Sequence, residues 1–99
     1  MNEQPFSASG YTGVIEMNVV HEEKYVFNGK DYTIRILDKG GEFLARGFFN
    51  NRPVSHMYSV EKSTRLSFME SFNHDPFIDL IKSVKEDIGG DIGQKYLIL

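Results

Sequence analysis

The sequence predicts an α+β fold, an antiparallel β-meander of four to five strands packed on one C-terminal amphipathic helix. Two observations carry this prediction: strand-like runs joined by short turns between residues 25 and 60, and a helical apolar stripe after Asp75-Pro76. The length of 99 residues indicates a single domain. We assign residues 13–99 to that domain and residues 1–12 to a flexible N-terminal tail.

The clearest local signal is Asn28-Gly29, which separates the runs 25–27 and 30–37. A type I′ turn needs positive φ at both central residues, and Asn and Gly tolerate that conformation best. The second run alternates apolar and polar residues, which predicts a strand with one buried face formed by Tyr32, Ile34 and Ile36.

Three further strands are predicted, at residues 14–20, 42–49 and 54–60. Turns are expected at residues 38–41 and 50–53, which are rich in Gly, Asn, Asp and Pro. Residues 61–74 carry both a helical spacing (Leu66, Met69, Phe72) and a short strand-like alternation, so we expect an irregular or helical crossover there.

The helix is predicted over residues 75–88. Asp75 can accept a hydrogen bond as the N-cap, and Pro76 fits the first helical position. The Gly89-Gly90 pair is expected to end the helix in a left-handed conformation. The helical stripe consists of Phe77, Leu80, Ile81, Val84 and Ile88. With this stripe, the predicted core contains Tyr32, Ile34, Ile36, Phe43, Ala45 and Phe49. The apolar C-terminal residues 96–99 are expected to form an edge strand or to cover the core.

The net charge is −3, but residues 24–65 hold eight basic and four acidic residues, while both flanking segments are acidic. Charge complementarity within the molecule would explain this distribution. A basic sheet surface that faces an anionic partner would also explain it.

Chemical motifs are absent from the sequence. There is no Cys, which excludes disulfides and thiolate chemistry. His21, His56 and His74 form no metal-binding pattern, and neither a GxSxG elbow nor a phosphate-binding glycine loop occurs. We therefore expect no enzyme, no cofactor and no metal. The sequence also shows no signal peptide and no apolar run near the about 20 residues of a membrane span, so we expect a cytoplasmic protein without membrane contact.

The second face of the sheet is unusual. A solvated antiparallel face should be mostly polar, yet this face combines three apolar side chains with two arginines. Arg and aromatic residues are enriched in protein interfaces. The cover could come from the chain itself, from a second subunit, or from nucleic acid or another partner. The candidate interaction surface consists of Arg35, Leu37, Leu44, Arg46 and Phe48.

A family resemblance rests on the run from Tyr25 to Ile36, on Ala45 to Phe48, on Arg52-Pro53-Val54, on Tyr58-Ser59-Val60 and on the helix from Leu80 to Ile88. In these residues the chain resembles small uncharacterised bacterial proteins of the kind encoded by mobile integron gene cassettes. The resemblance covers roughly residues 24–88. It implies a bacterial, cytoplasmic accessory protein, and it transfers no catalytic or binding residue.

These observations favour a non-catalytic protein-interaction module that self-associates through its sheet, with a homodimer as the first expectation. The alternative is a small nucleic-acid-binding accessory protein that uses the basic segment 24–65. The net negative charge argues against that alternative.

Overall fold

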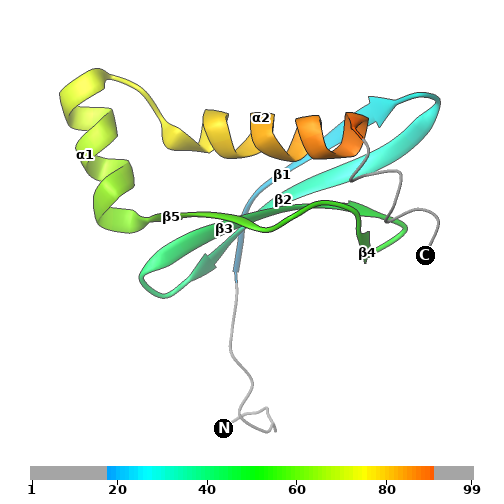
Figure 1. Ribbon diagram of the computed structural model, residues 1–99. Coiled ribbons are helices and arrows are strands. Elements are labelled where there is room, and N and C mark those ends of the chain that lie inside the picture. The colour runs from blue at the N-terminus through cyan, green and yellow to red at the C-terminus, as the bar shows by residue number, and fades with distance from the viewer. Residues whose placement is uncertain (1–17, 91–99) are drawn as a thin grey trace, which may run out of the picture.

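The computed structural model describes residues 18–90, which form one antiparallel sheet and two helices (Figure 1). The strands run β1-β2-β3 across the sheet, and both β4 and β5 pair with β3. The predicted α+β meander with a C-terminal helix is confirmed, and a second helix precedes it. The elements are β1 (Asn18–Phe27), β2 (Lys30–Lys39), β3 (Glu42–Phe49), β4 (Arg52–Pro53), β5 (Tyr58–Glu61), α1 (Lys62–Phe72) and α2 (Pro76–Gly89).

The β1–β2 hairpin turns at Asn28 and Gly29, which have φ values of 54° and 78°. This confirms the positive φ that the Asn-Gly pair predicted at both positions. Residues 18–20 do not form a separate first strand, because β1 continues from Asn18 to the turn as one strand, with a register shift between Val19 and His21. Residues 14–17 of that predicted strand lie outside the described residues, as do the predicted tail 1–12 and the segment 91–99.

The β3–β4 turn uses the same backbone chemistry. Asn50 and Asn51 have φ values of 52° and 64°, and Asn is one of the few residues with a side chain that tolerates this region. The turn is therefore shorter than the predicted segment 50–53, and Arg52-Pro53 already pairs with β3.

The predicted strand 54–60 is broken, and this expectation was wrong. Pro53 lies opposite Phe48, whereas Tyr58 lies opposite Ala45. Residues 54–57 therefore face only the two β3 residues between these pairs, which leaves two extra residues in the edge strand. This is a bulge. It turns Val54 into the core and leaves His56 exposed.

α2 covers one face of the sheet and closes the core (Figure 1). The predicted core is largely confirmed, although Phe43, Phe49, Phe77 and Ile81 are only half-buried against it and Val54 was missed. Helix and sheet approach closely at Gly47, where a Cβ atom would lie 2.9 Å from Val84 Cγ1 and 3.0 Å from Ile88 Cδ1. The buried core consists of Tyr32, Ile34, Ile36, Ala45, Val54, Leu80, Val84 and Ile88.

The N-terminal end of α2 is as predicted, whereas its C-terminal end differs from the prediction. The Asp75 side chain accepts a 3.0 Å hydrogen bond from the Phe77 N–H, and Pro76 opens the helix. Gly90 has an extended backbone with φ of −108° instead of the predicted left-handed conformation. Within residues 61–74, where we expected an irregular or helical crossover, residues 62–72 form the 11-residue helix α1, and Asn73 caps it with φ of 50°.

Candidate interaction surfaces

The structure brings the five predicted surface residues together on one face of β2 and β3. Leu37 pairs with Leu44, and Arg35 pairs with Arg46. Because neighbouring residues of a strand alternate between faces, these side chains point away from α2, while Ile34, Ile36, Ala45 and Gly47 point toward it. We call this side the open face of the sheet.

The two arginines of the open face are already engaged within the chain. Arg35 Nε donates to Glu22 Oε1 at 3.2 Å, and its guanidinium group lies 5.0 Å from the Phe48 ring centroid. Arg46 Nε donates to the Ser55 carbonyl oxygen at 3.0 Å. Leu44 is only 7% exposed. The open face therefore offers less free cationic and apolar surface than its sequence predicted.

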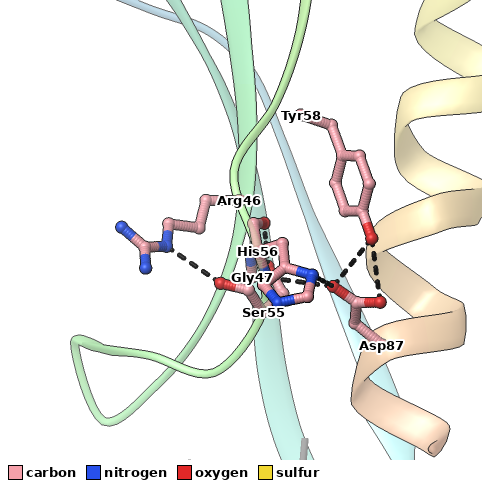
Figure 2. Close-up of polar contacts among 6 residues, drawn as sticks. All are labelled: Arg46, Gly47, Ser55, His56, Tyr58 and Asp87. Atoms are coloured by element: carbon pink, nitrogen blue, oxygen red, sulfur yellow. Dashed lines mark hydrogen bonds and ion pairs between the residues drawn. The ribbon is translucent and has the colours of Figure 1, made fainter. Parts of the chain in front are cut away.

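Sequence reasoning missed a polar cluster at the bulge (Figure 2). Ser55 is fully buried. Its hydroxyl accepts a 2.9 Å hydrogen bond from the Gly47 N–H and donates one of 2.8 Å to the His56 carbonyl oxygen. The broken strand has no backbone carbonyl in place for Gly47, so the Ser55 hydroxyl satisfies a buried donor that the ladder leaves open.

Asp87, on the last turns of α2, holds the other side of the bulge. Its carboxylate accepts hydrogen bonds of 2.9 Å from the His56 N–H and from the Tyr58 hydroxyl, as Figure 2 shows. Burial, together with the Asp87 charge, raises the pKa of Tyr58 to about 12. A carboxylate near a helix C-terminus is disfavoured by the helix dipole, and these two donors offset that cost.

Ser55, His56 and Asp87 are the residue types of a hydrolytic triad, but they are not arranged as one. A triad needs the nucleophile hydrogen-bonded to the base. Here the Ser55 hydroxyl is buried and donates to a backbone carbonyl, while His56 Nδ1 lies 3.6 Å from Asp87 Oδ2. We therefore interpret Ser55, His56, Tyr58 and Asp87 as a structural latch between the bulge and α2, and we call them the bulge latch.

The first turns of α1 are fixed to the body of the molecule. Arg65 makes two hydrogen bonds to the Asp75 carboxylate, at 2.9 and 3.0 Å, and its guanidinium carbon lies 3.8 Å from the Phe77 ring centroid. Arg65 thereby holds the pKa of Asp75 below its ordinary value. Lys62 Nζ lies 3.0 Å from Asp38 Oδ1.

The rest of α1 projects beyond these contacts. No residue of α1 is buried, and Figure 1 shows the helix beside the N-terminal end of α2, away from the centre of the sheet. The spacing of Leu66, Met69 and Phe72 is typical of a helix. Whether other residues bury these three side chains depends on the tertiary structure. We call the face of α1 formed by Leu66, Phe68, Met69, Glu70 and Phe72 the α1 tip. Its exposed apolar side chains are Leu66 (57% exposed), Phe68 (41%), Met69 (40%) and Phe72 (68%).

A shallow groove of about 370 Å³ lies beside α2 and ends on β1. Lys85 Nζ lies 3.3 Å from Glu23 Oε2, which ties the helix to the strand across the groove. The hydrogen bond from His21, followed by the Lys85 contact, lowers the pKa of Glu23. We call this the α2–β1 groove; it is lined by Glu23, Ile78, Ile81, Lys82 and Lys85.

Comparisons with protein-family models, with curated proteins and with solved structures find no match for this chain. Within residues 18–90, no cluster of three or more His, Asp or Glu side chains is arranged to hold a metal ion. Neither helix of this described part has the length and apolarity to cross a membrane.

Proposed function

We propose that this chain is a non-catalytic protein-interaction module that self-associates, and that the α1 tip is its principal contact. One observation carries the proposal: α1 exposes four large apolar side chains and buries none. Helices shorter than about 12–15 residues are marginal in water and depend on packing of an apolar face. A second copy of the chain supplies that packing.

The size of the exposed surface supports this proposal. Leu66, Phe68, Met69 and Phe72 are 40–68% exposed. At roughly 100 Å² each they present about 400 Å² of apolar surface, which is within the range of the largest patches on monomers, patches that often serve a function.

The open face of the sheet remains a second predicted contact, through Arg35, Leu37, Leu44, Arg46 and Phe48. Val19 and Val26 on β1 add exposed apolar area to it. The internal pairing of both arginines and the burial of Leu44 make it the weaker surface of the two. A bacterial cytoplasmic setting is part of the proposal, and it rests on the family resemblance and the absence of Cys.

Nucleic-acid binding through segment 24–65 has less support. Four of its eight cations are engaged by the chain itself: Arg35 by Glu22, Arg46 by the Ser55 carbonyl, Lys62 by Asp38 and Arg65 by Asp75. A titration with single- and double-stranded oligonucleotides at low salt separates the two functions. Binding that weakens steeply with added salt would favour the alternative, because displaced counterions mark phosphate contacts.

The experiment for self-association is light scattering over a range of protein concentrations with three variants. F72D places a charge in the α1 tip and should yield a monomer. S71D adds the same charge at the neighbouring exposed position and should leave assembly unchanged. F48D tests the open face; dissociation by F48D but not by F72D would assign the contact to the sheet instead. A strictly monomeric wild-type chain would refute self-association.

A further inference from the structure

The α1 tip and the α2–β1 groove are chemically complementary. The tip is an apolar surface with one charge, Glu70, which lies one helical turn after Leu66. The groove is lined by the apolar side chains of Ile78 and Ile81 and by the basic residues Lys82 and Lys85. Lys85 is paired with Glu23, whereas no ion pair joins Lys82 to another residue of the described segment.

We propose that the α1 tip of one copy docks in the α2–β1 groove of a second copy, and that the α1 tip of the second copy docks in the groove of the first. This inference rests on the proposed self-association and names its binding site. An amphipathic helix that lays its apolar face in an apolar groove is a recurrent mode of protein recognition. In this arrangement Glu70 of one copy reaches the rim at Lys82 of the other.

Charge disfavours the simplest competing dimer, in which two α1 tips pack against each other. A two-fold axis through that contact would bring the two Glu70 side chains to the same interface, and like charges that face each other are destabilising. The groove relieves this cost, because Lys82 of one copy meets Glu70 of the other.

The area fits a closed dimer. Counted once in each of the two copies, the four apolar tip side chains and Ile78 expose about 1,000 Å² of apolar surface, close to the lower bound for a specific interface. The contact is isologous, so it closes at two copies and does not propagate into a filament.

The absence of Cys allows a direct test, because any introduced cysteine is the only thiol in the chain. E70C and K82C are prepared as separate single variants, mixed in equal amounts and oxidised. A disulfide between the two variants can form only between chains. We expect the E70C–K82C dimer to form at least about tenfold faster than an E70C–E70C dimer. The control replaces K82C with K39C, at the exposed β2–β3 turn, and should give only slow, random cross-linking.

Each other result overturns the inference in a distinguishable way. Faster E70C–E70C cross-linking would mean that two tips pack together. Equal rates with K82C and K39C would mean random collision. Assembly in light scattering without any preferred cross-link would place the contact elsewhere and leave self-association intact. A monomer at all concentrations would end the proposed function as well.

Discussion

Gly47 illustrates how one residue can set the distance between sheet and helix. Its missing side chain lets Val84 and Ile88 pack directly on the β3 backbone. We expect G47A to lower the free energy of unfolding by about 1–3 kcal/mol, because the added methyl group must displace two buried side chains. Chemical denaturation measures the change. G41A is the matched control, since its Cβ meets nothing within 4 Å; an equal loss in both variants would contradict the packing explanation.

The ionisation of Tyr58 should make the free energy of unfolding depend on pH at alkaline values. Its pKa is about 12 in the folded protein against an ordinary value of 10. Between these values the unfolded chain has lost the proton and the folded chain keeps it. The stabilisation is therefore complete below about pH 10 and is lost as the pH rises through about 12.

The prediction is that Y58F removes part of this alkaline slope and lowers stability near neutral pH by about 1–2 kcal/mol, because Asp87 loses a donor. Urea unfolding at about pH 8 and about pH 11 measures both effects. Some slope should remain in Y58F, since burial also raises the pKa of Tyr32. An unchanged alkaline slope would show that the pKa of Tyr58 is not raised in the folded protein.

Among the elements, the broken edge strand depends most on a single side chain. We expect S55A to cost about 1–3 kcal/mol, because it leaves the buried Gly47 N–H without an acceptor. S59A, at an exposed position of β5, should cost much less. Thermal unfolding compares the two variants, and similar losses would mean that the bulge does not depend on the Ser55 hydroxyl.

Local chemistry explains which elements could be predicted from the sequence. The turn at Asn28-Gly29 and the start of α2 at Asp75-Pro76 depend on neighbouring residues, so their residue types reveal them. The bulge could not be predicted, because Asp87 lies 31 residues after His56 in the chain. Its only signal was a run at 54–57 that lacks a clear alternation of apolar and polar residues.

The same reasoning applies to the candidate surfaces. The alternation in β2 and β3 predicted that Arg35, Leu37, Leu44, Arg46 and Phe48 share a face, and the register places them so. It could not predict that Glu22 and Ser55 engage the arginines, because those partners come from other strands and from the bulge. Likewise, the spacing in 66–72 fits a helix, but its exposure follows from where α1 leaves the sheet.

At the scale of the whole molecule, the central claim is that α1 is completed by a second copy. The measurement that tests it most directly is sedimentation equilibrium of the wild-type chain beside F72D and S71D. We expect a wild-type dimer, a similar dimer for S71D, and a dissociation constant raised at least about 30-fold for F72D, as expected for a central aromatic contact of about 2 kcal/mol or more. A wild-type monomer, or a dimer that F72D leaves unchanged, would contradict it.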